Sequence, residues 1–160
     1  MCAKAEFFEL TGKYDDAFEW YAKVQERYDD SQPLIDFCNR FKEKTGDHRF
    51  DAALKSQAGK IFPDGIEKVS LKDFKSAPDN GVLVQTESDL LHAAGMKAGD
   101  VIVALNGVRI HAFDQYVFER DTSAMPEMTL IVWQGNQYHE IKASPPNHRF
   151  DADMGDYSAK

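Results

Sequence analysis

The hydrophobic pattern of the sequence changes near residues 61–65, Ile-Phe-Pro-Asp-Gly. Before this point apolar residues recur every three or four positions, which is the period of an amphipathic α-helix. After it, short runs rich in β-branched residues are separated by Gly, Asn, Asp or Pro, which is typical of strands and turns. A chain of 160 residues has room for two small domains. We therefore expect a helical region over 1–60, a β-rich domain over 61–144 and a tail or linker over 145–160.

Composition narrows the class of protein. With 42% hydrophobic and 29% charged residues, the chain can bury a core and is expected to be soluble. Its net charge of −8 opposes broad contact with phosphate backbones, so no nucleic-acid partner is expected. Its longest apolar stretches are far shorter than the roughly 20 residues that span a bilayer, so no membrane insertion is expected. The compartment stays open: the cytoplasm is slightly favoured, and the periplasm would require a signal upstream.

The first 60 residues predict four helices. Residues 3–28 read as two helices joined at Gly12-Lys13, with Ala5, Phe8, Ala17, Phe18 and Val24 among the periodic apolar positions. A second pair follows, over residues 34–44 and 50–61, with a turn at Thr45-Gly46-Asp47. The turn glycines Gly12 and Gly46 lie 34 residues apart. Antiparallel helical hairpins with this period are typical of tetratricopeptide repeats.

The first helical pair resembles a tetratricopeptide repeat at five positions: Gly12, Tyr14, Ala17, Tyr21 and Val24. The second pair departs from the repeat, because Phe50 comes one residue late after Gly46 and the second aromatic residue is missing. Two units alone bury little core, so they are either the end of a longer array or a pair that packs on another domain. A generic pair of helical hairpins is the alternative interpretation.

Five strands are predicted after Pro63, at residues 66–74, 81–86, 101–105, 129–134 and 137–143. Gly135-Asn136 supplies a two-residue hairpin between the last two. A short helix is predicted from Ser88 as N-cap to Gly95, and a second from Asp114 as N-cap to about Ala124.

The run Gly81-Val-Leu-Val-Gln-Thr, followed by Gly95-x-x-x-Gly99-Asp100-Val-Ile and Asn106-Gly107, resembles a PDZ domain of the bacterial, protease-associated type. The resemblance covers about residues 61–144. It implies a five- to six-stranded, partly open β-barrel or sandwich with two helices, so that the whole chain would be α+β.

The PDZ resemblance implies that an extended peptide or a C-terminus of a partner protein binds by addition of a strand. The carboxylate loop would be residues 62–66, the edge strand residues 66–71, and the facing wall the helix after Asp114. The implied peptide-binding residues are Phe62, Asp64, Gly65, Ile66, Glu67, Lys68, Val69, Gln115, Phe118, Glu119 and Thr122. A shift by one residue would turn Phe113, Tyr116 or Val117 toward the groove instead.

Asp64 departs from the PDZ pattern, because an acid stands where the loop usually carries an apolar residue. It would repel an incoming carboxylate by about 1 kcal/mol. The groove would then take an internal segment, or be filled by helices or the C-terminal tail. Three functions stay open: a non-enzymatic interaction module whose helical repeats add a second surface, a regulatory fragment of a larger peptidase, and a structural spacer with an occluded groove. The protein is expected to be a monomer or weak dimer.

No catalytic or cofactor motif is found. The five histidines are scattered, without H-E-x-x-H, G-x-S-x-G or a Gly-rich phosphate loop, so neither catalytic residues nor a metal or cofactor are predicted. Cys2 and Cys38 read as free thiols, with Cys38 as a small buried hydrophobe. The pentapeptide His-Arg-Phe-Asp-Ala occurs twice, at 48–52 and 148–152, and the sequence offers no physical reason for it.

Overall fold

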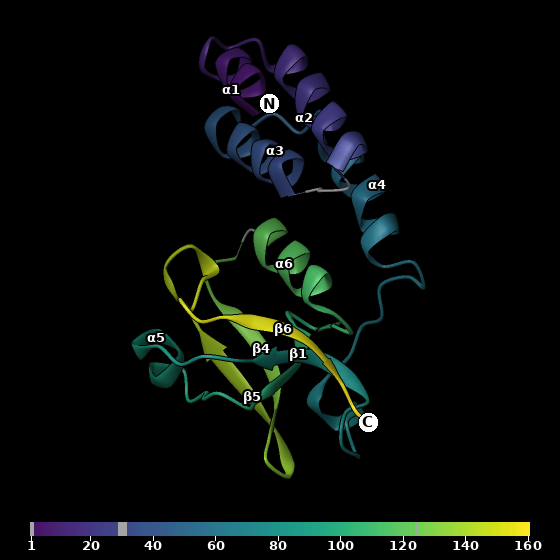
Figure 1. Ribbon diagram of the computed structural model, residues 1–160, viewed down its shortest axis with the longest axis vertical. Helices are drawn as coiled ribbons and strands as arrows, with labels where there is room; N and C mark the ends of the chain where they lie inside the picture. Colours follow the sequence, from purple (N-terminus) through teal and green to yellow (C-terminus); the bar gives the residue numbers. More distant parts are fainter. Residues whose placement is uncertain (1, 29–31, 124) are drawn as a thin grey trace. The chain divides into compact units, whose positions relative to one another are not determined.

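The computed structural model describes residues 2–28, 32–123 and 125–160, with the backbone alone for Cys2, Leu54, Lys55 and Gln57. The chain divides into a helical unit, Met1–Pro63, and a second unit, Asp64–Lys160, that is built on an antiparallel sheet (Figure 1). The α+β class is therefore confirmed, and the boundary falls within the segment where the hydrophobic pattern changes.

Four helices form the first unit, at the predicted positions: α1 (Cys2–Leu10), α2 (Tyr14–Tyr28), α3 (Gln32–Thr45) and α4 (Asp51–Ile61). Gly12 and Gly46, at the two turns, have φ values of 76° and 68°. This left-handed region is open to glycine at little cost, which explains why the helices end there.

The core of the helical unit is aromatic. Ala5 and Ala17 are fully buried, so α1 and α2 can approach closely, and the rings of Phe37, Phe41 and Phe50 pack on one another. Cys38 is buried, as predicted, and burial raises the pKa of its thiol to about 12. The thiol therefore stays protonated and unreactive at neutral pH, and the side chain contributes only to packing.

The second unit holds a six-stranded sheet in the order β5-β4-β2-β1-β6, with β3 paired to β2. The strands are β1 (Asn80–Val84), β2 (Val101–Leu105), β3 (Val108–Arg109), β4 (Met128–Gln134), β5 (Gln137–Ala143) and β6 (Met154–Ser158). Strand β2 is buried at all five positions because it lies in the middle of the sheet. Four of the five predicted strands are confirmed.

The prediction of a strand over 66–74 is wrong. Residues 71–73 form a 3-10 helix, closed by a capping box between Ser70 and Asp73. The preceding segment makes a single bridge, from Lys68 to Val108 of β3. It therefore lies beside β3 and is not one of the two end strands of the sheet, β5 and β6.

The expectation of a tail or linker after residue 144 is wrong for its last part. After a 3-10 turn at Pro146–His148, the chain returns as β6 and pairs with β1 in antiparallel register, from Val84↔Met154 to Asn80↔Ser158 (Figure 1). The final strand thus forms the end of the sheet beside β1.

Two longer helices complete this unit, α5 (Asp89–Ala93) and α6 (Phe113–Thr122). Ser88 caps α5 as predicted, because its side chain accepts a hydrogen bond from the Leu91 N–H. The predicted N-cap of α6 is wrong: Ala112 occupies that position, and Asp114 lies in the first turn. A carboxylate from β6 replaces the local cap, because the Phe113 N–H donates to Asp156 Oδ1 at 2.7 Å.

Candidate functional site

The outer edge of β6 exposes backbone hydrogen-bonding groups. The Gln85 N–H donates to Asp153 O, and the Ala159 N–H donates to Asp79 O, each at 2.8 Å, so the odd-numbered residues of this stretch face β1. In an antiparallel ladder the residues between them point their N–H and C=O groups the other way. Those residues are Met154, Asp156 and Ser158. In the described part of the chain β6 is the last strand on this side of the sheet, so these groups face outward.

A pocket of about 210 Å³ lies at the beginning of β6. One wall is the helix α6, which contributes side chains spaced three and four residues apart, and the other is the loop that leads into β6. The lining residues are Phe113, Tyr116 and Arg120 from the helix and Arg149, Phe150, Asp151, Ala152, Asp153 and Met154 from the loop and strand. The pocket therefore combines an aromatic wall with two guanidinium groups and two carboxylates.

The helix wall of the pocket includes two residues of the alternative face considered from the sequence, Phe113 and Tyr116. Gln115 and Phe118, which were predicted to face the groove, are buried with 8% and 6% of their surface exposed. The Thr122 hydroxyl donates a hydrogen bond to the backbone oxygen of Phe118 in the same helix, at 2.7 Å. The pocket is lined by Phe113, Tyr116 and Arg120 on α6, and the role of Gln115, Phe118, Glu119 and Thr122 in peptide binding stays a prediction.

Residues 62–69 are not among those that line this pocket. Phe62 is buried and belongs to the helical unit, whereas Asp64, Gly65, Ile66, Glu67 and Lys68 are exposed and Val69 is half-buried. The N–H of Val69 donates to Gly107 O at 2.8 Å, and the N–H of Arg109 donates to Glu67 O at 2.9 Å. The structure thus pairs this segment with β3, and its predicted role in peptide binding stays a prediction.

Glu119 of α6 interacts electrostatically with Lys68, which belongs to the segment predicted to bind peptide. Burial raises the pKa of its carboxyl, and the positive charge of Lys68 opposes that rise. Glu119 therefore lies near Lys68 on a side of α6 that does not line the pocket.

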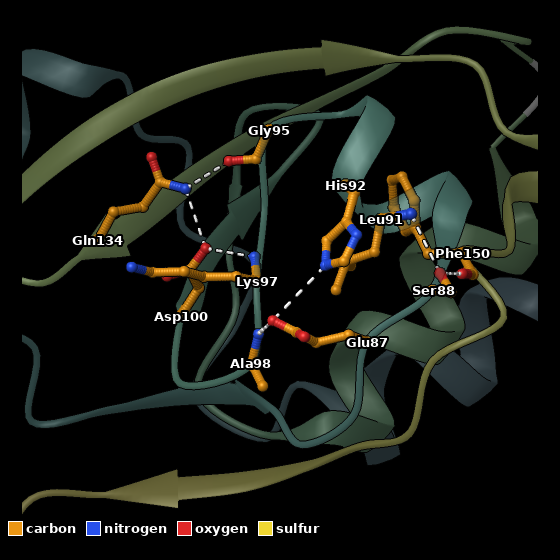
Figure 2. A network of polar contacts seen from close by, with 10 residues as sticks. All are labelled: Glu87, Ser88, Leu91, His92, Gly95, Lys97, Ala98, Asp100, Gln134 and Phe150. Carbon is orange, nitrogen blue, oxygen red and sulfur yellow. Dashed lines mark hydrogen bonds and ion pairs between the residues drawn. The ribbon is translucent and has the colours of Figure 1, made fainter.

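Phe150 anchors the loop between β5 and β6. Its side chain is 3% exposed, and its carbonyl oxygen accepts a hydrogen bond from the Ser88 hydroxyl. The same hydroxyl oxygen accepts from the Leu91 N–H at 3.1 Å, so Ser88 serves both α5 and the loop (Figure 2). This contact holds the loop wall of the pocket against α5.

A buried carboxylate fixes the turn that follows α5. Asp100 is 1% exposed, and its Oδ2 accepts hydrogen bonds from the Lys97 N–H at 2.9 Å and from Gln134 Nε2 at 2.9 Å (Figure 2). Gln134 Nε2 also donates to Gly95 O at 2.8 Å. The Gly-Asp motif recognised in the sequence therefore serves to join α5, β2 and β4 and supplies no chemistry to the pocket.

Charge is unevenly distributed around the pocket. The guanidinium of Arg120 pairs with Asp121 at 2.8 Å, whereas Arg149 is exposed. Burial raises the pKa of Tyr116 to about 12, so its hydroxyl stays neutral. Arg149 is thus the more exposed of the two pocket cations, and it shares the pocket with the exposed carboxylates of Asp151 and Asp153.

The residues that sequence reasoning missed lie in 149–158. This stretch has three acids and no β-branched residue, so it carries few of the usual signals of a strand. Its tertiary partner β1 determines its conformation. Asp151, in the left-handed region with φ 54°, turns the loop and is one of the few non-glycine residue types that tolerate this conformation.

No protein-family model and no curated protein matches the sequence. Among solved structures, the chain is similar to the PDZ domain of EpsC from Vibrio cholerae, residues 204-305, at 22% sequence identity and a TM-score of 0.34. The match covers 61% of this chain and 95% of that chain.

The described residues include no helix that is long and apolar enough to cross a membrane. They also bring together no group of three or more His, Cys, Asp or Glu side chains that could hold a metal ion.

Proposed function

We propose that this chain is a non-enzymatic protein–protein interaction module with a PDZ-like domain, and that it binds an extended peptide as an added strand on the outer edge of β6. The observation that carries the proposal is the row of outward backbone groups at Met154, Asp156 and Ser158, which ends at a pocket beside α6. Main-chain pairing would supply affinity, and the pocket would select a side chain.

The pocket is suited to the end of a peptide. Arg149 offers an exposed guanidinium, while Phe113 and Tyr116 offer an aromatic wall for an apolar side chain. A C-terminal residue carries both features, an apolar side chain and a carboxylate. We therefore propose that the terminal residue of the ligand occupies this pocket and that its preceding residues run along β6.

The helical unit is proposed to be a tetratricopeptide-like pair that offers a second surface for packing or interaction. The support is the left-handed glycines 34 residues apart and the small residues Ala5 and Ala17 in its core. Its exposed apolar side chains include Phe7, at 58%, and Leu10, at 85%, both on α1.

The test begins with a library of random heptapeptides displayed with free C-termini and selected against the full chain. The selected sequence is then synthesised as a free acid and as a C-terminal amide, and each form is titrated by fluorescence anisotropy and by amide NMR. We expect a dissociation constant on the order of micromolar, because a short strand buries little surface. Shifts should concentrate in residues 149–158 and α6, and the amide should bind at least about tenfold more weakly than the acid.

Arg149→Gln should reproduce most of the loss seen with the amide, whereas Arg27→Gln, an exposed arginine on α2, should bind as wild type. Absence of selected peptides, or shifts that map to 62–71 and leave 149–158 unmoved, would overturn the proposed site. Equal binding of acid and amide would overturn the terminal-carboxylate part and leave strand addition of an internal segment.

A further inference from the structure

His148 links the two walls of the pocket through backbone carbonyls. It ends the 3-10 turn at Pro146–His148 and lies one residue before Arg149. Its Nδ1 lies 3.1 Å from the carbonyl oxygen of Arg120, and its Nε2 lies 2.6 Å from the carbonyl oxygen of Met125. Arg120 belongs to the last turn of α6, and Met125 follows that helix.

A carbonyl oxygen can only accept a hydrogen bond, so each ring nitrogen must donate to satisfy both contacts. A neutral imidazole has one N–H and can donate to one carbonyl, whereas an imidazolium can donate to both. The acceptors are also electrostatically suited to a cation, because the last carbonyls of a helix lack intrahelical donors and carry its negative end.

We infer that His148 is a positioning residue that sets the width of the pocket by tying the loop between β5 and β6 to the C-terminal end of α6. This inference rests on the proposed function of that pocket. On the other side of the same loop, Phe150 is tied to α5 through Ser88. The residue between them, Arg149, is therefore held by anchors on both sides.

The tie depends on the protonation of the ring, because the second proton adds the second hydrogen bond. The elements that His148 touches carry several charged side chains. They are Glu119, Arg120 and Asp121 from α6, Glu127 from the segment that contains Met125, and Arg149 and Asp151 from its own loop. Arg120 and Asp121 neutralise each other as an ion pair.

The experiment measures the loop without any peptide. Amide hydrogen exchange of Arg149 and Asp153, whose N–H groups donate to Pro146 O and Thr86 Oγ1, is followed in the full chain by NMR at pH 6 and pH 8. Rates are corrected for intrinsic exchange, and the ring signals of each histidine are recorded. We expect protection of these amides to fall about fivefold or more at pH 8, since one hydrogen bond of the tie is lost. The change should follow the ring of His148.

His148→Gln keeps an amide donor but cannot titrate, so it should retain part of the protection and remove its pH dependence. His148→Leu, which has no donor, should lose protection at both pH values. His92→Gln alters an exposed histidine paired with Glu87 and should leave the profile unchanged. Amides of β2 and β4 report whether each variant is folded.

Protection of Arg149 and Asp153 that is the same at pH 6 and pH 8 in the wild type would overturn the inference, whether or not the variants fold. So would a pH dependence that persists in His148→Gln. Because no ligand is present, either result leaves the peptide-binding proposal intact, and a failure to select peptides leaves this measurement intact.

Discussion

The carboxylate of Asp156 on β6 accepts a hydrogen bond from the backbone N–H of Phe113, the first residue of α6, at 2.7 Å. Residues 154, 156 and 158 expose their backbone to the outer edge of β6, so this side chain crosses from the proposed docking strand to the helix that faces it. The contact caps α6, and we expect a peptide added to β6 to compete with it.

Replacing Asp156 should therefore separate stability from binding. Asp156→Ala removes a capping carboxylate and should lower the free energy of unfolding by about 1 kcal/mol. It should at the same time bind the selected heptapeptide more tightly, because the ligand no longer displaces the contact with Phe113. Urea unfolding and anisotropy measure the two effects. Asp79→Ala removes the same charge from an exposed position before β1 and keeps the contact, so it should change neither quantity appreciably. Weaker binding by Asp156→Ala would show that the contact supports the site.

Two glycines of the paired strands β1 and β6 should respond differently to alanine. A Cβ on Gly81 would lie 2.6 Å from the carbonyl oxygen of Ile102, in the backbone of β2, whereas a Cβ on Gly155 would meet only the side-chain end of Gln85 at 2.9 Å. Gly81→Ala should destabilise the sheet unit by about 2–4 kcal/mol, and Gly155→Ala by less than about 1 kcal/mol, because only a flexible side chain has to move. Thermal unfolding of both variants measures the two destabilisations. Equal destabilisation by Gly81→Ala and Gly155→Ala would contradict this packing.

The Ser88 hydroxyl makes two hydrogen bonds: it caps α5 by accepting from the Leu91 N–H, and it donates to the carbonyl oxygen of Phe150 in the loop. Ser88→Ala should cost about 1–2 kcal/mol in the free energy of unfolding, more than a single cap, because it also leaves the Phe150 carbonyl without this donor. Amide hydrogen exchange in this variant should become faster both in α5 and in residues 149–151. Ser144→Ala, at an exposed serine after β5, is the matched control and should be neutral. An effect confined to α5 would show that Phe150 needs no such anchor.

The turns and buried strands could be predicted because they depend on local chemistry. Gly12, Gly46 and Gly95 all adopt positive φ where the sequence placed helix ends, and Ser88 caps the helix that its position predicted. Strand β2 is a run of apolar residues buried at every position, which is the strongest strand signal in the chain.

The edge of the sheet could not be predicted, because it depends on which segment of the chain pairs with β1. The segment 66–71 has better strand-forming residues than 154–158, but the latter pairs with β1. The repeated pentapeptide makes the same point: His48–Ala52 leads into α4, where Phe50 joins an aromatic core, whereas His148–Ala152 forms a turn and a loop. Identical local sequence thus adopts two conformations, each determined by its tertiary contacts.

Acid should weaken the helical unit through Glu9. The hydrogen bonds from Arg40 lower the pKa of the Glu9 carboxyl against the opposing effect of its burial. A carboxyl with a lowered pKa contributes stability above its unfolded-state value, near 4.5, and this contribution is lost as the pH falls through its folded-state value. Arg40→Gln should therefore be less stable than wild type at pH 7, and the difference should shrink at pH 3. Exchange of the buried Phe37 amide in urea measures it, with Arg27→Gln as the control; a difference that persists at pH 3 would contradict a role for the Glu9 charge.

Proline can test strand addition without altering any side chain of the pocket. Proline has no N–H, so it is tolerated on an edge strand where that group faces outward and disrupts the ladder where it faces a neighbouring strand. The register with β1 assigns the outward position to Ser158 and the inward position to Tyr157. Ser158→Pro should therefore keep the sheet folded, within about 1 kcal/mol of wild type, whereas Tyr157→Pro should break the pairing of β6 with β1 and unfold this edge.

The same pair of variants separates backbone pairing from pocket recognition. Because Ser158 lies outside the pocket, a peptide held only by its terminal residue would bind Ser158→Pro as tightly as wild type. A peptide that pairs along β6 loses the donor at this position and meets the proline ring, so its affinity should fall about tenfold or more. The comparison uses the selected heptapeptide and a version truncated to its last three residues, which is too short to reach Ser158. The heptapeptide alone should discriminate between wild type and Ser158→Pro, because only the longer ligand extends along the strand; a loss shared by both peptides would indicate a distorted pocket and would contradict the outward register of Ser158.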